Sequence, residues 1–96
     1  MINIESTFTK YEDEYLKFDR VEKKYSSRPD ICAFILLDKL VPSNGHDMIS
    51  AAEHDEIFLN TDCEKLAEVA TEEDILMLKR CGVNYSGDFE CLSMFV

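Results

Sequence analysis

The sequence predicts a small two-layer α+β domain, with N-terminal helices packed against a three-stranded antiparallel sheet that includes a C-terminal β-hairpin. Two observations predict this class. The densest apolar run, residues 31–41, lies between Pro29 and Pro42, which are placed to start and stop a helix. Two predicted strands, residues 83–85 and 89–95, flank a Ser-Gly-Asp turn at residues 86–88. A chain of 96 residues has room for one hydrophobic core, so residues 1–96 are expected to form a single domain.

The first predicted element is an aromatic amphipathic helix over residues 9–26. Thr9 and Glu12 have the spacing of a capping box, in which a hydroxyl and a carboxylate bind free amides at a helix N-terminus. At about 100° per residue, the large aromatic side chains fall on one narrow stripe. Residues 1–8 show no clear period, and we expect a frayed end or a short strand there.

The aromatic stripe of that helix is expected to belong to the core or to a helix–helix contact. The alternative is a partner-binding or dimerising interface, because tyrosine combines a large contact area with a polar tip that tolerates water. The residues of this candidate interface are Tyr11, Tyr15, Phe18 and Tyr25.

The second predicted helix, residues 28–41, is the central apolar helix of the domain. Pro29 suits its first turn, and Pro42 follows its end. Ile31 and Ile35 lie on the side opposite most of its apolar residues, and a helix that is apolar on more than one side is buried from more than one direction. This helix is therefore either central in the domain or part of an oligomer interface. A buried strand in the same run is the competing prediction.

Residues 47–96 are predicted to form an acidic α/β part that ends in a hairpin. Capping-box spacings begin at Thr61 and Thr71, and Gly82 is a suitable C-terminal stop for a helix. The elements predicted here are a short helix over 47–53, a strand over 56–60, helices over 61–70 and 71–82, and strands over 83–85 and 89–95.

The charge of the chain points to one class of partner. Twenty acidic residues against ten basic ones give a net charge of −10, and most of the excess follows residue 30. Direct binding to nucleic acid or to an anionic membrane needs clustered Lys and Arg, so neither is expected. A protein partner with a basic surface is expected instead, because an acidic surface speeds encounter with a cationic one.

The carboxylates expected to form this acidic partner-binding face follow residue 52. The alternative is that they only cap helices and face solvent. The acidic face comprises Glu53, Asp55, Glu56, Asp62, Glu64, Glu68, Glu72, Glu73 and Asp74.

The four cysteines are expected to be free thiols of a cytoplasmic protein. The first residues have neither the basic start nor the apolar run that is typical of a secretion signal, and no apolar run is long enough to span a bilayer. The Cys spacing contains no Cys-x-x-Cys pair of the kind that holds zinc. A zinc site assembled in space, from Cys63, Cys81, Cys91 and a histidine, is the alternative.

No motif predicts an enzyme, a cofactor or a metal. His46-Asp47 and His54-Asp55 are residue types that bind divalent cations, but a metal phosphohydrolase needs a much longer helical scaffold, so surface residues are expected. A Cys thiolate paired with His54 has no supporting motif. The three glycines form no phosphate-binding loop. A small metal- or thiol-dependent enzyme therefore remains only as an alternative hypothesis.

In size and charge balance alone, the chain resembles the acidic inhibitors that bacteriophages make against restriction and CRISPR systems. That resemblance implies a nucleic-acid mimic, whose carboxylates imitate a phosphate track and block the basic groove of a nucleic-acid-binding protein. No motif accompanies it, so no residue role is carried over. The second hypothesis is a structural or assembly protein that forms a homo-oligomer through residues 9–41.

Overall fold

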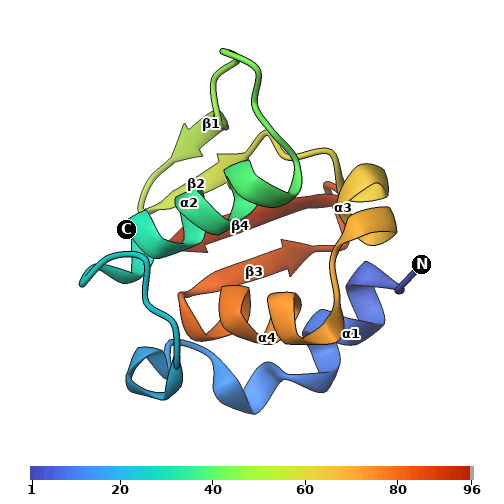
Figure 1. The fold of residues 1–96 in the computed structure, drawn as a ribbon. Coiled ribbons are helices and arrows are strands. Elements are labelled where there is room, and N and C mark those ends of the chain that lie inside the picture. The colour runs from blue at the N-terminus through green and yellow to red at the C-terminus, as the bar shows by residue number, and fades with distance from the viewer. Residues whose placement is uncertain (96) are drawn as a thin grey trace.

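A four-stranded antiparallel sheet covered by helices forms the domain, and the computed structural model describes residues 1–95. The strands are β1 (Ile49–Glu53), β2 (Glu56–Leu59), β3 (Val83–Ser86) and β4 (Cys91–Phe95). Their order in the sheet is β1-β2-β4-β3, so β4 lies between two strands that are distant from each other in sequence (Figure 1). The helices are α1 (Ile4–Lys10), α2 (Pro29–Leu40), α3 (Cys63–Val69) and α4 (Glu72–Arg80).

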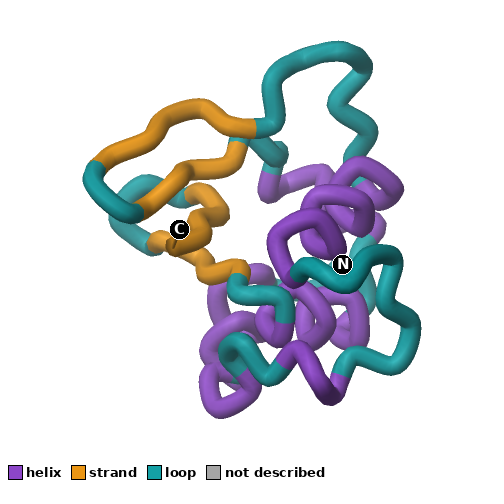
Figure 2. Tube along the Cα trace, turned by 90° about the vertical axis from the view of Figure 1, so that its left-hand side faces the viewer, coloured by secondary structure: helices purple, strands orange, loops and turns teal. Residues whose placement is uncertain are grey.

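The helices and the strands form two layers. In Figure 2 the strands lie on one side of the molecule and most helices lie on the other. Val83 pairs with Met94, and Tyr85 pairs with Leu92, so these side chains share the face of the sheet that meets the helices. Val83, Leu92 and Met94 are buried there. The α+β class and the C-terminal hairpin are confirmed, and the sheet has one strand more than predicted.

The central apolar helix is confirmed as α2. Pro29 occupies its first turn, as the sequence indicates, and the helix ends before Val41. Its buried side comprises Cys32, Ala33, Leu36 and Leu37. Ile31 retains 43% of its accessible surface, so this helix is not enclosed on every side.

The predicted helix over residues 9–26 is wrong. The helix begins earlier, at Ile4, because the Asn3 side chain caps it by accepting from the Ser6 amide over 2.8 Å. Thr9 is therefore an interior residue of α1, and its hydroxyl donates to the Glu5 carbonyl oxygen over 2.9 Å. Residues 4–8 are therefore helical, which corrects the strand or frayed end predicted over residues 1–8.

Beyond Tyr11, contacts with α4 replace helical geometry. Two short 3₁₀ turns follow, η1 (Glu12–Glu14) and η2 (Phe18–Arg20). Leu16 lies between them at a φ of 58°, and its amide donates to the Lys79 carbonyl oxygen over 3.1 Å. That oxygen belongs to the last turn of α4 and also accepts from the Gly82 amide over 3.0 Å. A distant segment thus adds a hydrogen bond at the end of α4, and the helical pattern of residues 9–26 gives way to this tertiary contact.

The short helix predicted over residues 47–53 is also wrong, because the segment forms β1. β1 pairs with β2, with Ala52 opposite Ile57 and Glu53 opposite Glu56. Every residue of β1 is exposed, so the helical tendency of the two alanines gives way to backbone pairing with β2 rather than to burial.

The remaining predicted elements are present, with small changes at their ends. The helix after β2 is capped by Asp62 rather than Thr61, since the Asp62 side chain accepts from the amides of Glu64 and Lys65. At α4 the predicted capping box is complete: Thr71 accepts from the Asp74 amide, and Asp74 accepts from the Thr71 amide. None of the helices among residues 1–95 is long and apolar enough to cross a bilayer.

Candidate partner-binding groove

An open groove of about 1120 Å³ lies where the start of the chain meets α3 and the sheet. The segment around Ile2 forms one wall, and its backbone amide donates to the Ala67 carbonyl oxygen of α3 over 3.2 Å. The loop from β2 to α3 forms a second wall, and Glu90 and Cys91, at the start of β4, form the third. The groove therefore combines segments that are far apart in sequence.

Five carboxylates line this groove, and no Lys or Arg side chain of residues 1–95 does. They come from three places in the fold: α1, α3 with the residue that caps it, and the turn before β4. We call this set the groove carboxylates. They are Glu5, Asp62, Glu64, Glu68 and Glu90.

The groove carboxylates differ in the hydrogen bonds that they accept from other groups of the chain. Asp62 accepts from two backbone amides at 3.0 and 3.3 Å, so part of its charge stabilises the start of α3. Glu5, Glu64, Glu68 and Glu90 are exposed, and their side chains have no hydrogen bond or ion pair within residues 1–95. These four side chains are therefore free to meet a cationic ligand.

Apolar groups and two thiols form the less polar part of the groove lining. Leu59 is buried, and Cys63 and Cys91 are half-buried. Burial, together with the neighbouring Cys91 and Asp62, raises the pKa of the Cys63 thiol to about 11. A thiol with so high a pKa is almost entirely protonated at neutral pH, so Cys63 is a poor nucleophile.

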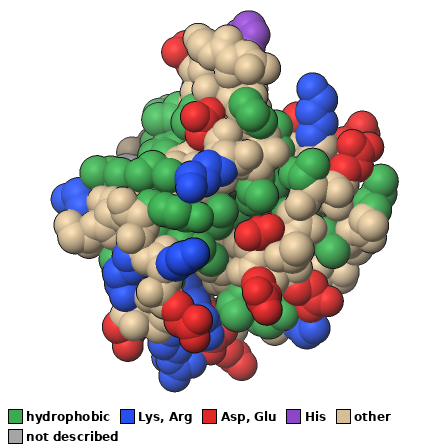
Figure 3. All heavy atoms as spheres, viewed as in Figure 1, with side chains coloured by type: hydrophobic (Ala, Val, Ile, Leu, Met, Phe, Trp, Pro, Cys, Tyr) green, Lys and Arg blue, Asp and Glu red, His purple; other side chains and the backbone are tan. Residues whose placement is uncertain are grey.

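The predicted acidic face is not one continuous surface. Glu53, Asp55 and Glu56 lie at the turn between β1 and β2, at the opposite end of β2 from α3. Only Asp62, Glu64 and Glu68 of the predicted set line the groove. Figure 3 likewise shows acidic side chains spread over several parts of the face that it draws.

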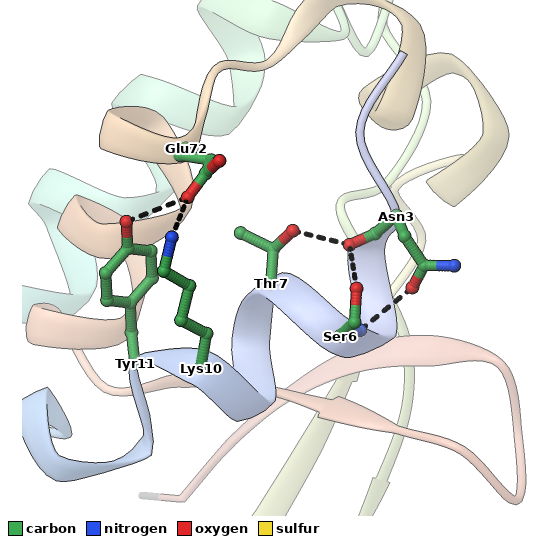
Figure 4. A network of polar contacts seen from close by, with 6 residues as sticks. All are labelled: Asn3, Ser6, Thr7, Lys10, Tyr11 and Glu72. Atoms are coloured by element: carbon green, nitrogen blue, oxygen red, sulfur yellow. Dashed lines mark hydrogen bonds and ion pairs between the residues drawn. The ribbon is translucent and has the colours of Figure 1, made fainter.

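The predicted acids at the start of α4 are engaged within the chain. Glu72 Oε1 accepts from Lys10 Nζ over 2.6 Å and from the Tyr11 hydroxyl over 3.1 Å, which joins α1 to α4 (Figure 4). The Lys10 hydrogen bond is the main cause of the lowered pKa of Glu72. Asp74 belongs to the capping box, while Glu73 is exposed.

The four residues of the candidate aromatic interface do not form a helical stripe. Tyr11 bonds Glu72, and the Tyr15 ring lies beneath the Lys79 amine, with 5.6 Å between the nitrogen and the ring centroid. Phe18 is half-buried and packs against the core. Tyr25 is 39% exposed, and Lys39 Nζ lies 4.4 Å from its ring centroid.

The histidines and cysteines are not brought together as a metal site. Within residues 1–95, no three His, Cys, Asp or Glu side chains are placed to share a metal ion. His54 lies in the turn between β1 and β2, whereas Cys63 begins α3 at the far end of β2. Cys81 is buried beside Cys32, which together with burial raises its pKa to about 12.

Sequence reasoning did not place Glu5 or Glu90 in the site. Glu5 lies in a segment without a clear period, and Glu90 belongs to a turn at a φ of 52°. Nothing in the local sequence of either residue indicates that it faces α3. Comparisons with protein-family models, curated proteins and solved structures found no match, so the function is argued from this geometry.

Proposed function

We propose that the chain is a non-enzymatic domain that binds a positively charged segment of a protein partner. The observation that carries the proposal is the groove with five carboxylates and no Lys or Arg among the described residues that line it. Negative charges grouped around one concave surface attract a cationic segment more strongly than the same number of negative charges spread apart. The low-dielectric walls of the groove focus the electric field of the carboxylates.

The class of partner follows from the same charges. A nucleic-acid-binding protein carries clustered Lys and Arg for phosphates, and those side chains are complementary to the groove carboxylates. Occupation of such a surface by this acidic domain would block access of nucleic acid to it. The net charge of −10 supports rapid encounter with that partner in the cytoplasm and makes binding weaken as salt increases.

A pair of matched variants tests whether the groove is the binding surface. The groove variant combines Glu64→Gln, Glu68→Gln and Glu90→Gln, which leaves the helix cap at Asp62 intact. The control variant combines Glu53→Gln, Asp55→Asn and Glu73→Gln, which removes the same charge from exposed positions outside the groove. The probe is a short oligo-arginine peptide, measured by calorimetry at low and at moderate salt.

We expect the groove variant to bind the peptide about tenfold more weakly, since each exposed ion pair contributes about 0.5 kcal/mol. The control variant should stay within about twofold of the unmodified protein. Equal weakening by the two variants would mean that total charge alone determines binding, and it would overturn the groove as the site.

Self-association is the second candidate function. Tyr25 and Ile31, both within residues 9–41, are 39% and 43% exposed, although each is a large apolar side chain. A second copy of the chain would cover such residues. Sedimentation velocity at micromolar concentration distinguishes the candidates, because a strict monomer that still binds the peptide supports the groove proposal alone.

A further inference from the structure

A second, smaller pocket of about 460 Å³ lies beside the edge strand β3. α1 borders it on one side, and residues of β2 and β4 reach it across the sheet. Its volume lies within the range of small-molecule sites. Phe8 and Phe95 give it apolar surface, while Ser86 and Ser93 add hydroxyl groups.

Lys79 lines this pocket and is the one buried lysine among residues 1–95. Its residue is 6% exposed, whereas the other six lysines are exposed. Its amine donates to Asn84 Oδ1 over 2.9 Å and lies 5.6 Å from the centroid of the Tyr15 ring. A lysine amine has three donor positions when charged, and Asn84 accepts from only one of them.

Desolvation makes the charged form of Lys79 less favourable than that of an exposed lysine, although the Tyr15 ring and the nearby carboxylates favour that charge. No carboxylate of residues 1–95 lies within ion-pair distance of its nitrogen. Burial lowers the pKa of Lys79, and the negative charge of Glu12 opposes that effect only in part. The neutral amine is the nucleophilic form, so a desolvated lysine is more reactive than an exposed one at the same pH.

We propose that the pocket beside β3 is a binding site for a small neutral aldehyde, with which the Lys79 amine forms an imine. The nitrogen lone pair attacks the carbonyl carbon, and the new C–N bond gives a carbinolamine. The two amine protons then leave with the carbonyl oxygen as water, and a C=N bond remains. The step needs no oxidant or reductant.

The charge of the pocket lining selects the kind of aldehyde. Glu5, Glu12 and Glu56 line the pocket with Lys79, so an anionic aldehyde meets three carboxylates. A neutral aldehyde avoids this repulsion, and its apolar part can contact Phe8 and Phe95. The preferred ligand is therefore a small, uncharged, partly apolar aldehyde.

Borohydride trapping tests the proposal. The protein is incubated with benzaldehyde at neutral pH, reduced with sodium borohydride, and examined by intact mass and peptide mapping. We expect one adduct, on Lys79, at a benzaldehyde concentration that leaves Lys65 and the other exposed lysines unlabelled. Labelling spread over the exposed lysines, with Lys79 unmodified, would overturn the proposal.

Variants and a charged analogue complete the experiment. Lys79→Met should lose the adduct, and Lys65→Met, the matched control, should keep it. Lys79→Arg keeps the positive charge and forms no stable imine, so it should also lose the adduct if the Met variant does not fold. Anionic 4-formylbenzoate should label Lys79 less than benzaldehyde does, and equal labelling would contradict the selection by the three carboxylates.

Discussion

Arg80 joins the end of α4 to η1 through Glu14, because its Nε and Nη2 atoms lie 2.9 and 2.8 Å from Glu14 Oε1. Arg20 binds the other oxygen of the same carboxylate over 2.7 Å. Arg80 Nη1 also donates to the Arg20 carbonyl oxygen over 3.3 Å. The Glu14 carboxylate thus holds residues 11–25, which we call the irregular segment, against α4.

The Glu14 cluster predicts an acid-sensitive contribution to stability. The Arg80 hydrogen bond is the main reason that the pKa of Glu14 is lowered in the folded chain. A lowered pKa means that this contribution is complete above the pKa of the unfolded carboxyl group and is lost as pH falls through the folded value. Glu14→Gln should therefore lower the free energy of unfolding at neutral pH and flatten its decline in acid.

Urea unfolding of the two proteins from neutral to acidic pH measures this effect. Glu73→Gln is the control, because Glu73 is exposed and has no hydrogen bond or ion pair within residues 1–95. If the difference between wild type and Glu14→Gln stayed constant with pH, the stabilising role of the carboxylate would be wrong.

Gly82 is the second point at which the irregular segment depends on α4. Its φ is +94°, and a Cβ atom there would lie 2.8 Å from Leu16 Cδ2. Gly45 has a similar φ of +85°, but nothing lies within 4 Å of a Cβ at that position. Gly45→Ala should therefore cost about 1 kcal/mol from backbone strain alone, and Gly82→Ala should cost slightly more, because the exposed Leu16 side chain must also move aside.

The double variant Gly82→Ala with Leu16→Ala separates the clash from the strain. Removing the Leu16 side chain should cancel the extra loss, so the two changes should combine to less than the sum of their single effects. Simple additivity in urea unfolding would show that Leu16 does not crowd position 82.

The sequence predictions were correct where neighbouring residues determine the conformation, and wrong where contacts with distant residues determine it. Pro29 and the Thr71 capping box act within one helical turn, so α2 and α4 were predicted correctly. The helix predicted over residues 47–53 was wrong because pairing of β1 with β2, rather than the local Ser-Ala-Ala pattern, determines the conformation of this segment. The helix predicted over residues 9–26 was wrong because the residues that this segment contacts, among them Lys79 and Arg80, lie about sixty positions away in the sequence.

The same reasoning applies to the candidate sites. The acidic composition predicted a cationic partner, and three of the nine predicted carboxylates line the groove. Glu5 and Glu90 join them only through the packing of α1 and the β3–β4 turn beside α3. Lys79 has no signal in the sequence at all, since a lysine in the last turn of a helix is ordinarily exposed.

The cysteines should react in an order that follows their burial. Burial and Cys32 raise the pKa of Cys81 to about 12, and burial and Cys91 raise that of Cys63 to about 11. We expect Cys91 to react first with a disulfide reagent, Cys63 more slowly, and the buried Cys32 and Cys81 only on unfolding. Peptide mapping after timed labelling gives the order. Rapid reaction of Cys63 at neutral pH would favour the thiol-dependent enzyme instead.

The buried amine of Lys79 should also leave a signature in alkaline stability, whether or not an aldehyde binds. Its pKa is lowered by burial from the ordinary 10.5, with Glu12 the charged group that acts against the shift. Between the folded value and 10.5, the unfolded chain binds more protons than the folded chain, so the free energy of unfolding rises with pH in that window. Lys79→Met removes this rise.

The measurement is the difference in unfolding free energy between wild type and Lys79→Met, followed from neutral to alkaline pH. The two proteins differ at no other ionisable position, so the difference isolates Lys79. We expect wild type to gain stability relative to Lys79→Met as pH rises toward 10.5. The opposite slope would place a charged ammonium, held by an unrecognised partner, in the pocket and would remove the basis for its nucleophilic role.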